Sequence, residues 1–166
     1  MARFSLGERK FYYYYFLLHI PITLLIDSSV VVPPEYHPAS KLVEWHIAQN
    51  NDFLLWEKPN WLYWFVVIEL VVQLPLFAKF ALALRPSQAT NSQEKDQKLE
   101  KENELNRWLR IYGLNASFTT LICMITIWQR GYRPFFPTQP LQIDEKIQLL
   151  LVYLPTFLIP LRLCFL

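Results

Sequence analysis

The stretch WLYWFVVIELVVQLPLFAKFALAL, residues 61–84, decides the fold class of this chain, because it is long and apolar enough to cross a lipid bilayer. A helix that spans a bilayer needs roughly 20 mostly apolar residues at a rise of about 1.5 Å each. Residues 11–32, 111–128 and 147–166 form three further stretches of this kind. Aromatic side chains gather at the ends of these stretches, as they do at the depth of lipid headgroups. The sequence therefore predicts an all-α fold, a four-helix transmembrane bundle.

The composition excludes several other classes of protein. The chain has 166 residues, of which 53% are hydrophobic and only 18% charged, so it has too much apolar surface for a disordered chain. Its net charge of +2 provides no basic field for nucleic acid, and Cys123 and Cys164 lie inside apolar stretches, which excludes a disulfide scaffold. The alternative of a soluble bundle with unusually apolar helices is disfavoured, since four stretches of spanning length rarely coexist in so short a soluble chain.

The distribution of Lys and Arg predicts the orientation of the bundle. The N-terminal tail and residues 85–107 carry eight of them, against five on the opposite side. Under the positive-inside rule, both termini and the 85–110 loop face the cytoplasm, and the 33–60 loop faces the lumen. The first stretch is too long for the core of a signal peptide, so we expect a retained helix. Residues 87–106 mix charges of both signs at helical spacing, which is typical of a solvated connector or of an extension of the third helix.

Polar side chains inside the apolar stretches are the strongest indication of a functional site. Asp27 lies in the first stretch, and Glu69 in the middle of the second, with Gln73 one helical turn later. A charge at bilayer depth costs about 3 kcal/mol on insertion scales, so these side chains should face the bundle interior. Two carboxyls in one dry cavity would share a proton, and could then receive a cation or an amine, or shuttle a proton in an enzyme. The structural alternative is that Asp27 caps the first helix and Glu69 bonds a neighbour.

Prolines inside three of the stretches predict bent helices around a cavity. Pro21, Pro75 and Pro155 each remove a backbone hydrogen bond and bend a helix. In a membrane bundle such bends open space between helices, so a pocket is expected at their junction, near the two carboxyls. His19 is interpreted as a buried, hydrogen-bonded histidine. The other two histidines form no metal-ligand pattern, and we expect neither a metal nor a cofactor.

Three strings in the sequence are similar to one family of membrane proteins. They are YFLLHIPITLLID at residues 15–27, ELVVQLPLF at residues 69–77 and VYLPTFLIP at residues 152–160. Together they resemble the EXPERA family, which includes the sigma-2 receptors and the emopamil-binding protein, a sterol Δ8–Δ7 isomerase. The stretch NDFLLWEKPNW at residues 51–61 is also similar to the family, while the third helix matches only through its Thr-Thr pair. The order of the strings suggests a fungal member, similar to those associated with mitochondrial targeting, and residues 1–166 are interpreted as one EXPERA-like domain.

The resemblance implies a ligand cavity inside the bundle, open sideways to the lipid. In sigma-2 receptors, the aspartate matching Asp27 pairs with the amine of cationic amphiphiles, and the glutamate matching Glu69 is hydrogen-bonded to it. Asp52 matches a second, lumenal aspartate, and Thr156 replaces the second tyrosine of the family's Y-x-P-Y motif, so one aromatic wall is expected to be missing. The expected ligand-binding residues are Asp27, Glu69, Gln73, Thr119, Thr120, Tyr153 and Thr156, supported by His19, Asp52, Pro21, Pro75 and Pro155.

The resemblance further implies a homodimer in the endoplasmic reticulum membrane. We expect a receptor for sterols or cationic amphiphiles that regulates lipid handling or protein targeting, and not an enzyme. One alternative is a sterol isomerase, which needs an acid and a base over the lipid. However, the isomerase relative places a histidine in its intramembrane site, and the second to fourth stretches contain no His. A second alternative is a quality-control or targeting factor for mitochondrial precursor proteins that acts through the cytoplasmic loop. A third is a membrane-structural protein without a ligand.

Overall fold

The computed structural model describes residues 4–85 and 95–166, and most of these residues are helical. The long elements are α1 (Leu6–Leu25), α4 (Asn60–Ile68), α5 (Leu74–Leu84), α6 (Lys95–Arg130) and α7 (Ile143–Leu163). A π-helical turn, η2 (Glu69–Gln73), joins α4 and α5 into one continuous helix. The short elements are η1 (Asp27–Val30), α2 (Ser40–Asn50), α3 (Phe53–Glu57), β1 (Tyr132–Arg133) and β2 (Phe136–Pro140).

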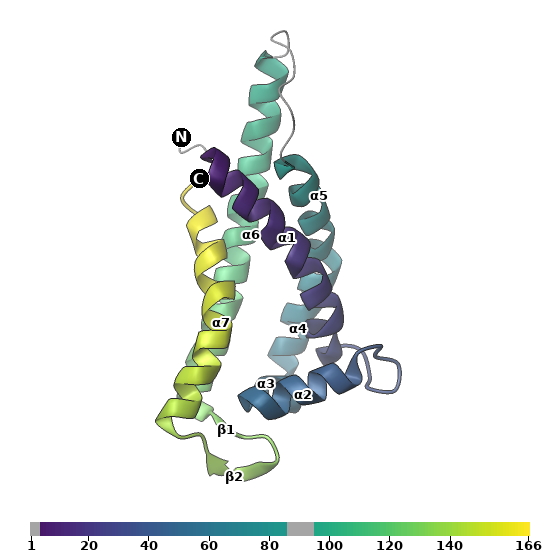
Figure 1. The fold of residues 1–166 in the computed structure, drawn as a ribbon, viewed down its shortest axis with the longest axis vertical. Coiled ribbons are helices and arrows are strands. Elements are labelled where there is room, and N and C mark those ends of the chain that lie inside the picture. The colour runs from purple at the N-terminus through teal and green to yellow at the C-terminus, as the bar shows by residue number, and fades with distance from the viewer. Residues whose placement is uncertain (1–3, 86–94) are drawn as a thin grey trace.

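The long helices run alternately in opposite directions along the molecule (Figure 1). The start of α1 and the end of α7 lie at one end, whereas α2, α3 and the two strands lie at the other. α6 packs along α7, and α1 packs along α5. β1 and β2 form an antiparallel hairpin, in which Tyr132 is paired with Pro140 and Arg133 with Phe136. The fold is therefore mostly helical, with one small hairpin that the sequence analysis did not expect.

Within the described residues, three helices are long and apolar enough to cross a membrane: Asn60–Leu84, Glu100–Arg130 and Ile143–Leu163. They contain the second and third stretches identified in the sequence and most of the fourth. α1 is not among them. Because it ends at Leu25, only 15 of its residues follow the charged residue Lys10, fewer than the roughly 20 that a span requires. A membrane crossing by α1 stays a prediction.

α1 ends earlier than the sequence indicated, at Leu25 instead of residue 32. Ile26 leaves the helical conformation with φ −122° and ψ −63°, and the next residues form the 3₁₀ turn η1. Ser28 Oγ donates a hydrogen bond to the carbonyl of Leu24 at 2.8 Å. Serine side chains compete with the backbone for such acceptors and so favour helix ends. The break places Asp27 on a short turn instead of in the body of a long helix.

The second and third helices also differ from the sequence-based expectation. Pro75 lies in the first turn of α5 and has no N–H for the carbonyl of Val71. The chain widens into the π-turn η2 just before it, and such turns accommodate a missing ladder bond without ending the helix. Residues 95–110, expected as part of a loop, form the beginning of α6. The other residues of that predicted loop from 86 to 94 lie outside the described residues.

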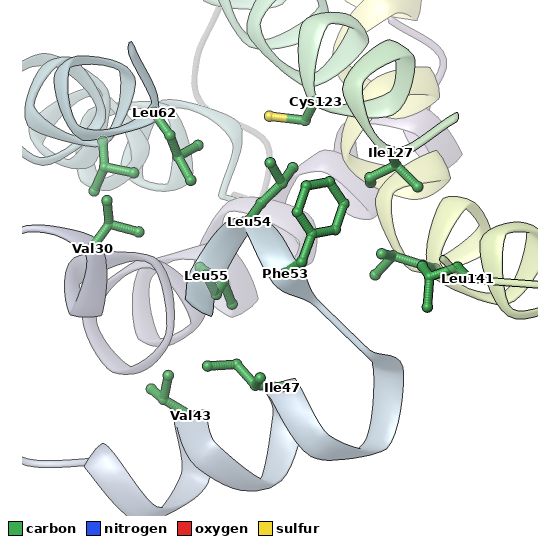
Figure 2. Packing of buried hydrophobic residues seen from close by; sticks show 12 residues of the cluster. Val30, Val43, Ile47, Phe53, Leu54, Leu55, Leu62, Cys123, Ile127 and Leu141 are labelled. Atoms are coloured by element: carbon green, nitrogen blue, oxygen red, sulfur yellow. The ribbon is translucent and has the colours of Figure 1, made fainter. Parts of the chain in front are cut away.

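Two clusters of buried side chains hold the helices together. The first lies at the end of the molecule that carries α2 and α3, where Ile47 of α2 points toward Leu55 of α3 (Figure 2). The second lies at the opposite end and is rich in aromatic rings. In it, Phe16 of α1, Phe77 of α5 and Tyr112 of α6 pack with ring centroids 5.3 to 5.8 Å apart. The space between the two clusters is where the candidate site lies.

Candidate functional site

A cavity of about 140 Å³, called the deep cavity below, lies between the two clusters. Its walls come from α1, η1, α3, α4, η2, α6 and α7. The structure brings together in this wall all seven residues expected to bind a ligand: Asp27, Glu69, Gln73, Thr119, Thr120, Tyr153 and Thr156. Of the supporting residues, His19 also lines the cavity. The others lie outside its wall: Asp52, Pro21, Pro75 and Pro155.

Two carboxyls reach the deep cavity from different elements. Asp27 is the first residue of η1, and Glu69 is the first residue of η2. Glu69 Oε1 accepts a hydrogen bond at 2.8 Å from Oγ1 of Thr23, a fully buried residue of α1. The family resemblance implied a hydrogen bond between the two carboxyls, whereas the partner of Glu69 in the structure is Thr23. The hydroxyl therefore fixes Glu69 against α1, and Asp27 faces the same space.

Hydroxyl groups on α6 partner carbonyls of the proline-containing helix α7. Pro160 has no N–H for the carbonyl of Thr156, four residues earlier. Thr120 Oγ1 donates to this carbonyl at 3.5 Å, and Ser117 Oγ donates to the carbonyl of Phe157 at 3.3 Å. Where water is absent, donors of this kind are what allows a proline to stay inside a membrane helix. Thr120 thus contributes to the helix contact as well as to the cavity wall.

Asp52 supports the cavity wall from outside. It is 1% exposed, and its Oδ1 accepts hydrogen bonds from the backbone N–H groups of Leu54 and Leu55, which caps α3. Its Oδ2 accepts a hydrogen bond from the Tyr153 hydroxyl at 2.9 Å and lies 3.6 Å from His46 Nε2. One carboxylate therefore joins α2, α3 and α7 and holds Tyr153 in the wall. His46 was not expected from the sequence as a neighbour of Asp52.

His19 is held by aromatic packing. Its ring stacks on Tyr15 with centroids 5.0 Å apart and meets the ring of Phe77 edge-on at 5.2 Å. The sequence predicted a hydrogen-bonded histidine, but no hydrogen bond to His19 is found among the described residues. The ring is positioned instead by its neighbours, with one side toward the deep cavity.

Two further aromatic side chains in the wall of the deep cavity were not expected from the sequence. Phe65 of α4 and Tyr112 of α6 both line it, although Thr156 stands where the family has a tyrosine. Tyr112 is 2% exposed, and its hydroxyl lies 3.1 Å from that of Tyr15. The signal that could have identified Tyr112 is its position next to Gly113, because a glycine in a membrane helix often marks a close crossing with another helix.

These features define a class of protein: a helical, multi-pass membrane protein with an interior cavity that holds two carboxyls. Residues 38–165 match the EXPERA family, the expanded EBP superfamily, and the chain belongs to this family. The resemblance seen in the sequence is thereby confirmed.

Similar proteins cover nearly the whole chain. It is 54% identical over 161 residues to Efficient mitochondria targeting-associated protein 19 of Saccharomyces cerevisiae, which covers 95% of this chain and 96% of that protein. It is 30% identical over 153 residues to human Sigma intracellular receptor 2, covering 87% of this chain and 77% of the receptor. The receptor of Xenopus tropicalis is 28% identical over 148 residues, covering 86% and 77%. The names of these relatives are those of receptors and of a targeting-associated protein, not of enzymes.

Proposed function

We propose that this chain is an endoplasmic reticulum membrane protein that binds sterols or cationic amphiphiles and regulates lipid handling or protein targeting. In this proposal α1 crosses the membrane together with the three candidate spans, and both termini face the cytoplasm. The observation that carries the proposal is the deep cavity itself, in which Asp27 and Glu69 are surrounded by apolar and aromatic side chains. Support also comes from the receptors among the relatives.

The chemistry of the cavity favours a cationic group. Carboxyls inside a membrane protein are costly unless they are partnered, and such residues commonly mark ligand or ion sites. Thr23 satisfies one oxygen of Glu69, while the remaining oxygens of the pair are available to a ligand amine. An ammonium group hydrogen-bonded to Asp27 would supply the missing positive charge in a site where water does not compete.

The size of the cavity indicates how a ligand would be accommodated. Its volume of about 140 Å³ is smaller than the roughly 300 Å³ or more of typical small-molecule sites. A sterol or an amphiphile would therefore place its polar end inside, and its apolar part would part the helices or extend between them into the lipid. This proposal follows the sideways opening that the family resemblance implies.

The test is binding of a labelled cationic amphiphile and of a labelled sterol to the purified full chain. Asp27→Asn and Glu69→Gln are compared with the wild type and with two controls, Asp144→Asn and Glu104→Gln, which neutralise exposed carboxyls outside the cavity. We expect the amphiphile to bind, and Asp27→Asn to abolish its binding while the fold persists and the controls bind normally. If neither ligand binds to folded protein, the two carboxyls are structural and the proposal fails.

The same assay tests the enzyme alternative. His19 lines the deep cavity together with the two carboxyls, so an acid and a base could face one lipid from α1 and η2. We nevertheless infer a binding protein, because the relatives are named as receptors or as a targeting-associated protein. Conversion of a Δ8 sterol in the presence of the wild type, lost in His19→Gln and in Glu69→Gln, would establish the isomerase instead.

A second candidate function is quality control or targeting of mitochondrial precursor proteins at the reticulum surface. It is favoured by the 54% identity to a protein named for efficient mitochondria targeting. In this proposal precursors are contacted by the charged beginning of α6. Reversing the charges of Glu100, Lys101 and Glu104 should impair precursor handling in cells and leave amphiphile binding unchanged. Chemical crosslinking of the purified protein tests the accompanying proposal of a homodimer.

A further inference from the structure

A second cavity, called the surface pocket below, lies under α2 and has a volume of about 230 Å³. Its lining residues come from η1, the turn after it, α2 and the region of α3, and it shares only Leu55 with the deep cavity. Lys58, which lines it, comes two residues before the candidate span Asn60–Leu84. A residue at that position lies at the depth of the lipid headgroups. The surface pocket is therefore a cavity at the membrane surface.

The surface pocket contains polar groups without the partners that buried groups usually have. Ser29 is 3% exposed, and its Oγ has no hydrogen-bond partner among the described residues. Ser29 is also one of the residues that line the pocket. Buried hydroxyls are nearly always hydrogen-bonded, so an unpartnered hydroxyl on a lining residue points to a bound group. Lys58 Nζ donates to the backbone carbonyl of Ser29, which uses one of its three donors. Lys58 has no ion-pair partner within the described part of the chain.

Lys58 is the positive charge of this pocket, because His37 is held in its neutral form. Ser28 Oγ donates to the carbonyl of Leu24, so in its 2.9 Å contact with Ser28 the Nε2 of His37 is the donor. Its Nδ1 accepts a hydrogen bond from the N–H of Ala39 at 3.3 Å, which a protonated ring could not do. Burial and the nearby Lys58 lower the pKa of His37. Burial also lowers the pKa of Lys58, because it disfavours the charged ammonium. An anion bound beside Lys58 would stabilise the ammonium form.

The rest of the lining adds a negative charge and an apolar floor. Glu44 is an exposed residue of α2 at the edge of the pocket. Trp56, 47% exposed, also lines it, and indole rings are enriched at headgroup depth. The floor is apolar, since Val43 and Ile47 of α2 point toward Leu55 (Figure 2). A matching ligand carries an anionic group, a cationic group and an apolar part.

We propose that the surface pocket binds the headgroup of a zwitterionic phospholipid with a primary ammonium, of the phosphatidylethanolamine type. Lys58 and the Ser29 hydroxyl bind its phosphate. Glu44 accepts hydrogen bonds from its ammonium, which a quaternary ammonium cannot donate. The volume of about 230 Å³ is below the roughly 300 Å³ at which pockets begin to enclose drug-sized molecules, so the acyl chains stay in the bilayer. This site is independent of the proposed function, because neither Asp27 nor Glu69 contributes to it.

The test uses the full chain in nanodiscs of phosphatidylcholine with a minor fraction of phosphatidylethanolamine, and it measures retained lipid by native mass spectrometry. The wild type should retain phosphatidylethanolamine in preference to phosphatidylcholine. Lys58→Gln should reduce this retention about tenfold or more, since a charge-assisted bond to phosphate is lost. Lys41→Gln, which removes an exposed lysine of α2 outside the pocket, should behave as the wild type. Wild-type retention in Lys58→Gln would overturn the proposal.

Ser29→Ala keeps the test decisive if Lys58→Gln does not fold. It removes an unpartnered buried hydroxyl, so the midpoint of thermal unfolding in pure phosphatidylcholine should stay the same or rise. The extra stabilisation by phosphatidylethanolamine should be lost in the same variant. A destabilised Ser29→Ala that still retains phosphatidylethanolamine would show a structural hydroxyl and overturn the proposal.

The chemistry of the headgroup is tested separately. Glu44→Gln should bind phosphatidylethanolamine and phosphatidylcholine equally, because the acceptor for the ammonium is weakened. Equal retention of phosphatidylglycerol and phosphatidylethanolamine by the wild type would overturn the zwitterionic assignment. Soluble glycerophosphoethanolamine binding as tightly as the lipid would overturn the assignment to a lipid. Asp27→Asn should leave retention unchanged, and a loss there would contradict the independence of the two sites.

Discussion

The deep cavity and the surface pocket lie on either side of the same short segment, η1, and yet differ in charge and in origin. Asp27 of η1 lines the deep cavity, and Ser29, two residues later, lines the surface pocket. The deep cavity collects residues from His19 to Thr156, whereas the surface pocket is built entirely between Ser29 and Lys58. The end of α1 at Leu25, and the turn η1 that follows it, therefore contribute to both sites: the deep cavity, whose residues are far apart in the sequence, and the surface pocket, whose residues are close together.

The difference in charge follows from depth. Carboxyls between membrane helices lose most of their hydration, so the deep cavity needs hydrogen bonds such as that from Thr23, or a cationic ligand. Lys58 is only half-buried beside the membrane surface, where a charge is cheaper to keep. Substitutions should accordingly affect the two sites separately, unless they alter a residue on which both depend.

Asp52 is such a residue, and its loss should have the largest effect. It caps α3, whose Leu55 lines both spaces, and it accepts the hydrogen bond from Tyr153 in the deep cavity wall. We expect Asp52→Ala to lower the free energy of unfolding by about 3 kcal/mol, since a helix cap is lost and a buried hydroxyl loses its partner. Chemical unfolding in detergent measures the loss, and binding of both ligand classes should weaken.

Tyr153→Phe is the matched control for Asp52→Ala. It removes only the hydroxyl that donates to Asp52, so about 1 kcal/mol of stability should be lost and phospholipid retention should stay normal. If Tyr153→Phe disturbs the surface pocket as much as Asp52→Ala does, the two sites are not separable in the way the structure indicates.

A smaller loss of stability, which affects the deep cavity but not the surface pocket, is expected from a substitution at the crossing of α6 and α7. A Cβ atom added to Gly113 would lie 2.6 Å from the carbonyl oxygen of Pro160. Gly113→Ala should therefore force the two helices apart at a cost of about 2 kcal/mol, the range measured for overpacked cores. Amphiphile binding in the deep cavity should fall, because Tyr112 and Ala116 on the same helix line it. Retention of phosphatidylethanolamine should not change.

Gly7→Ala serves as the control for this substitution. A Cβ atom there would meet only the Ser5 hydroxyl, at 4.0 Å, so stability should be unchanged or slightly higher. Wild-type stability in Gly113→Ala would mean that α6 and α7 can separate without cost, and the close crossing would then not define the cavity.

The sequence predicted the three helices that are apolar enough to cross a membrane, and the grouping of polar residues, for a simple reason. Long apolar stretches have few alternatives to crossing a membrane, and polar side chains inside them must turn inward. This reasoning brought Asp27, Glu69 and Gln73 to one cavity, where the structure also places them, although their role in binding stays a prediction. Phe65 and Tyr112 were missed because an aromatic residue in an apolar stretch gives no sign of which way it faces.

The surface pocket and the end of α1 could not be predicted from the sequence. Both depend on individual hydrogen bonds and packing contacts in the segment from η1 to Lys58, and a hydropathy pattern does not reveal such contacts. The partners of Ser28 are the carbonyl of Leu24 and the ring of His37, nine residues later, and neither is visible as a motif. The beginning of α6 was assigned to a loop for a related reason, because charges of both signs at helical spacing are typical of helices and of solvated connectors alike.

His37 lines the surface pocket and not the deep cavity, so its titration should report on the surface pocket alone. We expect a small dependence of stability on pH. The pKa of His37 is lowered from the ordinary value of 6.5 by burial and by Lys58. As the pH falls below that value, the unfolded chain takes up a proton that the folded chain resists, so stability should decrease toward lower pH. The slope is at most about 1.4 kcal/mol per pH unit, the limit for one proton. His37→Gln should flatten it, as measured by unfolding midpoints in a pH series.

Lys58→Gln provides the second arm of this titration. Without the neighbouring positive charge the pKa of His37 should be less depressed, so the decrease in stability should become shallower. A slope that is identical in the wild type, His37→Gln and Lys58→Gln would assign the pH dependence to other groups and would remove His37 from the description of the pocket.

The smallest effect on stability is expected for the ion pair that connects the end of α6 with α3. Arg130, the last residue of α6, lies 3.1 Å from Glu57 of α3, and the two side chains are 55% and 32% exposed. Exposed ion pairs contribute little because water and salt screen them, so Arg130→Gln should lower stability by about 0.5 kcal/mol or less. Neither ligand should bind differently. A loss well above this, insensitive to added salt and accompanied by weaker binding at both sites, would show that α6 and α3 move as one unit, and the deep cavity and the surface pocket would then have to be treated as coupled.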